Sequence, residues 1–226
     1  MAFLINQARL KQRSLFITLL DLRNAFGEVH QNLIQETLRF HHVPAEIQNL
    51  IKDLYTDFKT SVITTGYATP FIPVTKGVLQ GDCLSPLTFN MTFKIFIQLL
   101  RKEDYSQLGY KHDASLRPRN WLQFADDACV VTGQEYENQI LLNCFTAFCS
   151  WANMEARPDK CKAFGMMKVN TNCSQVSPKV FVSNQRIPPA LSTDSFTYLG
   201  RSFDFKMDNE SIRKSYWRQL ISCWKQ

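Results

Sequence analysis

Apolar positions recur along the chain with two different periods, and these periods predict an irregular mixture of strands and helices. Residues 14–22 form an apolar run that is broken by Asp21, which is typical of a buried strand. Apolar positions then follow at helical spacing in residues 31–42 and again after Pro44, a residue that suits the first turn of a helix. The first quarter of the chain therefore predicts a strand followed by two helices.

The same periods predict further elements in the rest of the chain, and their irregular order favours an α+β domain. We expect an apolar helix over 87–100, with Ser85 as its N-cap and Pro86 at its first position. The other expected elements are strands at 62–65 and 71–74, a hairpin over 121–131, a helix over 136–154, strands at 161–166, 179–182 and 197–203, and a helix from Glu210.

Composition limits the class of protein. The 226 residues are 45% hydrophobic and 20% charged, too apolar for a disordered chain. No segment reaches the ~18 apolar residues of a membrane span, and residues 1–13 lack the order of a signal peptide. Seven Cys without a C-x-x-C pair and four His without zinc spacing argue against a disulfide framework and a zinc site. We expect no membrane association and an intracellular location, in the nucleus or cytoplasm.

The charge balance allows a polyanionic partner without requiring one. The chain has 26 Lys and Arg against 20 Asp and Glu, a net charge of +6. A mildly basic protein without a nucleic-acid partner would show the same balance.

Acidic residues stand where two strongly apolar strands are interrupted. Asp21 follows Leu15–Leu20, and Asp126-Asp127 interrupt residues 124–131. Carboxylates beside buried strands are costly unless something pairs with them, and two-metal catalysis needs such carboxylates together. The alternative is that Asp21 ends a turn and the Asp pair forms an exposed hairpin tip.

A glycine-containing segment lies between these acids. Gln80 and Gly81 stand in a loop before the helix expected after Ser85. Gly permits close approach of the backbone, and free N–H groups at a helix start suit a base or a phosphate. A plain capping loop would explain Ser85-Pro86 but not the Gln-Gly-Asp before them.

Taken in order, these residues resemble the palm motifs of reverse transcriptases, and the similarity is greatest to non-LTR (LINE-type) retrotransposon enzymes, which are related to those of group II introns. The resemblance covers about residues 15–205. The matching segments are Leu20–Phe26, Gln80–Pro86, Phe124–Asp127, Pro158–Lys162 and Tyr198–Gly200.

The resemblance implies a role for each matching residue. Asp21, Asp126 and Asp127 would be the catalytic residues and would bind two Mg²⁺ ions, with Mn²⁺ as an alternative. Tyr198, Leu199 and Gly200 would form the primer-grip region. The nucleotide-binding residues would be Leu22 and Arg23 through their amides, Phe26 beneath the sugar, Gln80, Gly81, and Lys160 near the pyrophosphate.

The resemblance also implies a fold, partners and an activity. Residues 1–226 would form a reverse transcriptase palm domain, an antiparallel sheet with helices packed on one face, with partial fingers near 43–75 and the beginning of a thumb near 206–226. It would be an RNA-directed DNA polymerase whose partners are an RNA template, a DNA primer and deoxynucleoside triphosphates.

The chain departs from the family pattern in two respects. Asn24 and Gly27 stand where the family commonly has Lys and Asp, and Cys83 stands where Pro is usual. Few residues precede Asp21, so we expect most of the fingers to be missing, and the 26 residues after Gly200 are too few for a full thumb. We expect the endonuclease region to be missing too, although full element function would need all of these regions. The alternative function is a catalytically inactive palm fragment of a decayed element, which acts at most as a nucleic-acid-binding or interaction module.

Overall fold

The computed structural model describes residues 1–78, 81, 83–113, 115–169, 172–190, 194 and 196–203. The chain divides into two compact units. Unit 1 comprises Met1–Asp21, Lys102–Thr146 and Ala156–Gln226, and unit 2 comprises Leu22–Arg101 and Ala147–Glu155.

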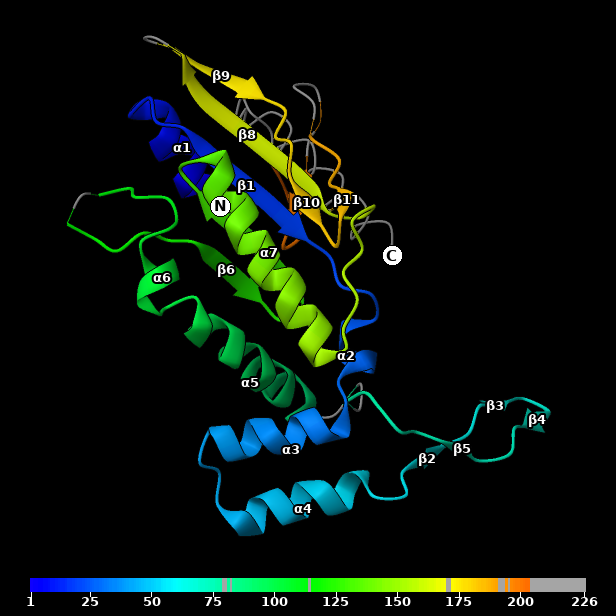
Figure 1. The fold of residues 1–226 in the computed structure, drawn as a ribbon. Helices are drawn as coiled ribbons and strands as arrows, with labels where there is room; N and C mark the ends of the chain where they lie inside the picture. Colours follow the sequence, from blue (N-terminus) through cyan, green and yellow to red (C-terminus); the bar gives the residue numbers. More distant parts are fainter. Residues whose placement is uncertain are drawn as a thin grey trace, which may run out of the picture. The chain divides into compact units, whose positions relative to one another are not determined.

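An antiparallel sheet is the framework of unit 1, and β1 lies at its centre (Figure 1). The order within the described residues is β6-β7-β1-β8-β9, and every neighbouring pair is antiparallel. The strands are β1 (Leu15–Leu20), β6 (Trp121–Phe124), β7 (Asp127–Thr132), β8 (Lys162–Val169) and β9 (Asn172–Val176).

One face of this sheet packs against helix α1 (Ala2–Leu10) and the hairpin of β12 (Phe196–Tyr198) and β13 (Arg201–Phe203). Successive strand residues point to opposite faces, so Leu15 and Ile17 of β1 share this face. The buried cluster also contains Leu4, Ile5 and Ala8 of α1, Cys129 and Val131 of β7, Phe164 and Met166 of β8, and Phe196, Phe203 and Tyr110.

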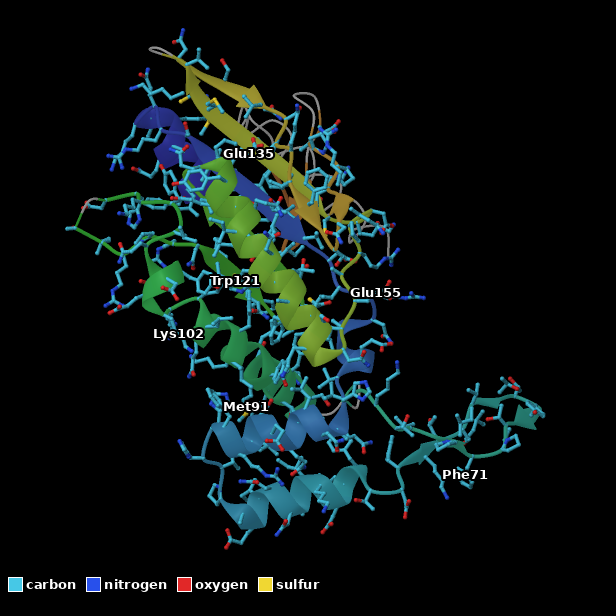
Figure 2. The ribbon with its side chains drawn as sticks, in the orientation of Figure 1. Phe71, Met91, Lys102, Trp121, Glu135 and Glu155 are labelled. Carbon is cyan, nitrogen blue, oxygen red and sulfur yellow. The ribbon has the colours of Figure 1, made fainter. Side chains whose placement is uncertain are left out.

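The other face packs against the first part of helix α7 (Glu135–Ala152), which runs along β1 in Figure 1. The buried Thr18 hydroxyl of β1 donates a 2.8 Å hydrogen bond to Oδ1 of Asn138. The Asn138 amide donates in turn to Phe16 O and Thr132 Oγ1. Trp121, labelled in Figure 2, packs on Phe145 of α7 with ring centroids 5.7 Å apart. Both faces of β1 are thus covered, which explains its continuous apolar run.

Unit 1 also contains shorter elements among its described residues. Their contacts include hydrogen bonds from the Gln139 amide of α7 to Phe181 O and from Phe181 N–H to Gln139 Oε1. The elements are α6 (Glu103–Ser106) and the hairpin of β10 (Phe181–Val182) and β11 (Gln185–Arg186).

Unit 2 is built from helices whose core is a chain of aromatic rings. Phe26 stacks on Phe89 with centroids 4.4 Å apart, and contacts continue through Phe93 to Phe148 at the end of α7. The helices are α2 (Ala25–Glu28), α3 (Gln31–Phe40), α4 (Ala45–Tyr55) and α5 (Leu84–Leu99).

A narrow antiparallel ribbon follows α4. It pairs β2 (Lys59–Thr60) with β5 (Ile72–Pro73), and β3 (Ile63–Thr64) with β4 (Tyr67–Ala68). All of these strand residues are exposed, and Phe71, labelled in Figure 2, is 74% exposed.

The α+β class with an antiparallel palm-type sheet is confirmed, and three details differ from the sequence-based expectation. Helix α1 packs on the second face of the sheet, whereas we expected helices on one face. Helix α5 begins at Leu84 with Cys83 as its N-cap, so Ser85 lies buried in the first turn instead of capping it. Helix α6 was not predicted. The helix expected from Glu210 and the thumb region near 206–226 lie outside the described residues.

The expected strands at 62–65 and 71–74 form the ribbon after α4, although their pairing with 59–60 and 67–68 was not predicted. No helix within the described ranges is long and apolar enough to cross a bilayer. The assignment of 43–75 to partial fingers and the intracellular location stay predictions.

The buried Thr18–Asn138–Thr132 network gives a direct test of this fold. Asn138→Ala removes the acceptor of a buried hydroxyl, so we expect the free energy of unfolding to fall by about 2–3 kcal/mol. Urea denaturation measures it, and Asn143→Ala on the exposed face of α7 is the matched control. If both variants lost the same small amount, Asn138 would not be the link between α7 and β1. The double variant Thr18→Val/Asn138→Leu should recover part of the loss, because it removes both partners.

Candidate active site

The register between β1 and β7 places two acids side by side at one end of the sheet. Leu20, the last residue of β1, pairs with Ala128 of β7. Asp21 directly follows Leu20 and Asp127 directly precedes Ala128, so the register brings the two acids to adjacent positions. Side chains point to alternate faces along a strand. Asp21 and Asp127 therefore lie on the same face as Ile17 and Cys129, which is the face that packs against α1.

The third acid stands in the turn that joins β6 to β7. Phe124 pairs with Asp127, which leaves Ala125 and Asp126 as a two-residue turn. Ala125 has φ = +52°, a left-handed conformation that costs energy for a residue with a Cβ. Gln123 braces the turn because its side-chain amide donates a 2.8 Å hydrogen bond to Ala125 O. The turn holds Asp126 exposed at its tip.

A pocket of about 480 Å³ opens beside these acids. Its lining comes from the β6–β7 turn (Phe124, Ala125, Asp126, Asp127) and from the β12–β13 turn (Leu199, Gly200). The second turn also has two residues, with φ = +51° at Leu199 and +71° at Gly200, the pattern of a tight type I′ hairpin turn. Two strained turns from distant parts of the sequence thus form the walls of one pocket.

The three acids interact electrostatically. Burial raises the pKa of Asp127 above its ordinary value of 3.8, and the carboxylates of Asp126 and Asp21 raise it further. Burial also raises the pKa of Asp21, with smaller contributions from Asp126 and Asp159. Repulsion between like charges therefore favours either a bound proton or a bound cation at this end of the sheet.

Arg157 opposes this repulsion. Its backbone N–H donates a 2.9 Å hydrogen bond to Asp21 O, and its Nε lies 4.0 Å from Asp21 Oδ2. Its Nη2 lies 3.6 Å from Asp159. The positive charges of Arg157 and Lys160 lower the pKa of Asp21 and partly offset the effect of burial.

Two buried thiols lie close to the acids. Asp21 N–H donates to Cys161 Sγ at 3.4 Å, and burial raises the pKa of that thiol to about 11. The Tyr198 hydroxyl shares a hydrogen bond with the thiol of Cys129, whose pKa burial raises to about 12. Burial raises the pKa of Tyr198 as well, and the Asp127 carboxylate adds to that rise. These groups stay protonated at neutral pH, and Cys161 accepts a hydrogen bond from the backbone of Asp21.

The donor set fits a hard divalent cation. Carboxylate oxygens are the ligands that Mg²⁺ and Mn²⁺ prefer, and a cation would relieve the repulsion that raises the pKa of Asp21 and Asp127. Within the described ranges, no group of three or more His, Cys, Asp or Glu side chains already has the arrangement of a metal site.

The predicted nucleotide-binding residues at the start of unit 2 are held by local contacts. Leu22 is buried. The Arg23 guanidinium lies 3.0 Å from Glu155 Oε2, and its backbone N–H donates to Glu155 O at 2.8 Å. The Arg23 amide that was expected to face a phosphate is therefore already bonded. Phe26 is half-buried against Phe89.

The segment before Gln80 runs alongside Phe26. Val78 N–H donates to Phe26 O at 2.8 Å, and Gly77 N–H donates to Val29 O at 2.7 Å. A Cβ at Gly77, where φ is +93°, would lie 2.9 Å from Gly27 O, so this close approach needs glycine. Gly81 is exposed, also with φ = +93°, and Gln80 lies outside the described residues.

The structure thus brings together, within unit 1, the predicted Asp21, Asp126, Asp127, Lys160, Tyr198, Leu199 and Gly200. Within unit 2 it brings Phe26 next to the segment that leads to Gly81. Sequence reasoning missed Arg157, although it directly precedes the matched Pro158–Lys162 segment, and it missed the pocket lining by Phe124 and Ala125. The catalytic, metal-binding and nucleotide-binding roles of these residues stay predictions.

An antiparallel sheet with carboxylates at the ends of two neighbouring strands is the arrangement expected of a polymerase palm. The family model described as "Reverse transcriptase (RNA-dependent DNA polymerase)" matches residues 2–203, and the chain belongs to this family. Reverse transcriptases generally use divalent metal ions.

Similar proteins are Pol polyproteins of R2 retrotransposable elements, which confirms the predicted likeness to non-LTR reverse transcriptases. The chain is 29% identical over 194 residues to the retrovirus-related Pol polyprotein from type-2 retrotransposable element R2DM of Drosophila melanogaster, covering 84% of the chain and 18% of the polyprotein. It is 29% identical over 206 residues to the type-1 element R2 polyprotein of Nasonia vitripennis, covering 87% of the chain and 19% of that protein. For the R2 polyprotein of Popillia japonica the identity is 27% over 202 residues, covering 88% and 32%. The chain therefore spans about a fifth to a third of these relatives.

Two telomerases are among the solved structures with a similar fold. Apo telomerase from Candida tropicalis, truncated from its C-terminal domain, matches 91% of this chain and 38% of that chain with a TM-score of 0.53 and 14% identity. Telomerase from Candida albicans, in complex with a fragment of telomeric RNA, matches 90% and 32% with a TM-score of 0.55 and 13% identity. At this identity the likeness shows the fold alone.

The raised pKa of Asp127 predicts that this site lowers stability at neutral pH. When the pKa of a carboxyl group is higher in the folded than in the unfolded chain, the free energy of unfolding falls as pH rises through these two pKa values. Asp127→Asn removes the titration, so its melting temperature should exceed that of the wild type by roughly 1–3 °C at pH 7. The gain should vanish below about pH 3, where the wild-type carboxyl is protonated in both states.

Thermal unfolding followed by circular dichroism between pH 3 and 7 measures the difference. Asp104→Asn, at an exposed acid in the first turn of α6, is the control and should give no gain. A gain for Asp127→Asn that does not change with pH would contradict the repulsion inferred for this site.

Proposed function

We propose that the chain is an RNA-directed DNA polymerase domain that extends a primer on an RNA template. The observation that carries this proposal is the set of three acids, at the ends of β1 and β7 and in the turn between β6 and β7, beside a pocket large enough for reacting groups. Membership of the reverse transcriptase family supports it.

The reaction is an in-line displacement at phosphorus. The primer 3′-hydroxyl attacks the α-phosphate of a deoxynucleoside triphosphate, the new P–O bond forms as the bond to the β-phosphate oxygen breaks, and pyrophosphate leaves. Asp21, Asp126 and Asp127 would hold two Mg²⁺ ions, or Mn²⁺ in their place. When bound, such ions activate the attacking hydroxyl and stabilise the leaving oxygen.

The chain's own groups position the reactants. The β6–β7 turn, braced by Gln123, fixes Asp126, and the β1–β7 register fixes Asp21 beside Asp127. Lys160 would place positive charge, or a proton, near the leaving pyrophosphate. The β12–β13 turn would hold the primer end, because Leu199 and Gly200 form the wall of the pocket that contains the acids.

Unit 2 would select the nucleotide. The ring of Phe26, fixed by stacking on Phe89, would crowd a 2′-hydroxyl and so favour deoxynucleotides. Gln80 and Gly81 would line the nucleotide and template pocket, and the amide of Leu22 remains a candidate for a phosphate contact. Full element function would also need the fingers, thumb and endonuclease regions that the resemblance to retrotransposon enzymes implies.

Primer extension with the purified chain tests the proposal. Asp126→Asn keeps the size of the side chain but removes its charge, so Mg²⁺-dependent extension of a DNA primer on an RNA template should fall at least about 100-fold. Binding of the primed template, measured by fluorescence anisotropy, should change by less than about threefold. Asp104→Asn is the matched control and should retain its rate.

The outcomes distinguish an active polymerase from a catalytically inactive binding module. Wild-type extension that depends on Asp126 supports the polymerase. Template binding without any wild-type extension supports the inactive binding module instead, and a near wild-type rate for Asp126→Asn overturns the assignment of the acids.

A further inference from the structure

A group of exposed cations surrounds the end of β1 that lies opposite the three acids. We call it the basic end surface, and its members come from the turn after α1, the loop 109–119 and the end of β8. They are Lys11, Arg13, Lys111, Arg117, Arg119 and Lys168, and all six are exposed.

Hydrogen bonds hold these segments against one another. Lys11 Nζ donates to His112 O at 3.0 Å, and Arg13 Nη1 donates to Lys111 O at 2.8 Å. On the other side of β1, Lys168 N–H donates to Ser14 Oγ at 3.1 Å. Tyr110 and Arg119 pair through two backbone hydrogen bonds, so the start and end of the loop are fixed. The cations are therefore gathered by the fold and not scattered along the surface.

Few acids among the described residues of these segments oppose the six cations. Asp113 accepts hydrogen bonds from the N–H and the hydroxyl of Ser115. Glu137 of α7 faces the loop through its 3.4 Å contact with Gly109 N–H. The surplus of positive charge is far denser here than in the whole chain, where 26 cations stand against 20 acids. Such a surplus suits a polyanion.

An exposed aromatic ring adjoins the cations. Phe3 of α1 is 59% exposed, and its ring lies edge-on to His112 with centroids 6.0 Å apart. A positive surface with an exposed aromatic ring is the combination that binds single-stranded nucleic acid, because phosphates pair with the cations and an unstacked base packs on the ring. An acidic protein segment would use the charges but not the ring.

We propose that the basic end surface binds the phosphate backbone of a single-stranded RNA, with Phe3 as a stacking platform for one base. From Arg13 to Asp21, eight strand-like residues span about 25 Å, so this surface is separate from the site of the three acids. The proposal rests on the proposed function in one respect, since the RNA template of that reaction supplies the strand.

The test removes four of the cations whose side chains have no hydrogen bond or ion pair within the described structure. The variant is Lys111→Gln/Arg117→Gln/Arg119→Gln/Lys168→Gln. The control removes the same charges from exposed positions elsewhere, as Lys52→Gln/Arg101→Gln/Lys179→Gln/Arg186→Gln. Binding of an unstructured single-stranded RNA and of a double-stranded DNA is measured by anisotropy over a range of salt concentrations, with the full chain.

We expect the first variant to bind RNA about tenfold or more weakly at about 0.1 M salt. The slope of log Kobs against log salt should become shallower by about 2–3, because each phosphate contact to a single strand contributes about 0.7. The control should change both quantities much less. Phe3→Ala should weaken RNA binding about tenfold without changing the slope, whereas Leu10→Ala, at another exposed apolar residue of α1, should not.

Three results would overturn the proposal: equal losses in the first variant and the control, an unchanged salt slope, or a loss confined to double-stranded DNA. Thermal unfolding of each variant shows whether the fold is kept, and the Lys111→Gln single variant, with an expected slope change of about 0.7, gives the same test with less perturbation. All titrations are repeated with Asp126→Asn. If the wild type failed to extend a primer while the expected effects on RNA binding were seen, the proposed function alone would be contradicted. If the wild type extended a primer but the RNA-binding effects were absent, the basic end surface alone would be contradicted.

Discussion

The antiparallel register between β1 and β7 is the constraint on which the site depends. Because Leu20 pairs with Ala128, Asp21 and Asp127 become neighbours although 106 positions separate them in the sequence. A slip of one residue would turn Asp127 to the opposite face and exchange the side chains of β7 between the two packed faces of the sheet. The buried network of Thr18, Asn138 and Thr132 opposes such a slip, since its hydrogen bonds form only in this register.

The same register brings negative charges together, and neighbouring cations reduce the free-energy cost of their repulsion. Arg157 and Lys160 lower the pKa of Asp21, while burial and the other acids raise it. The turns with positive φ at Ala125 and Leu199 line the pocket. Strain and repulsion of this kind persist at functional sites because the rest of the structure determines the conformation. In unit 1 the sheet, which is packed on both faces, determines the conformation of these turns.

Most of the fold could be predicted from the sequence, because long apolar periods determine β1, α3, α5 and α7 directly. Helix α1 was missed because Phe3, Leu4 and Ile5 are consecutive apolar residues, which give a weak helical period. The pairing within the ribbon after α4 could not be predicted, because its strands have two residues each and no buried face. The acids were found because an Asp at the end of an apolar strand is unusual, but Arg157 could not be assigned without the contact that the fold creates.

The central claim is that Asp21 and Asp127, together with Asp126, form one shared binding site for divalent cations. Titration of the purified chain with Mn²⁺, followed by electron paramagnetic resonance of the free ion, tests this claim without relying on catalysis. The account predicts that the wild type binds Mn²⁺, that Asp21→Asn and Asp127→Asn each weaken binding, and that the double variant is little worse than either single variant, because one shared site is lost. Equal Mn²⁺ affinity in the wild type and both single variants would contradict the account.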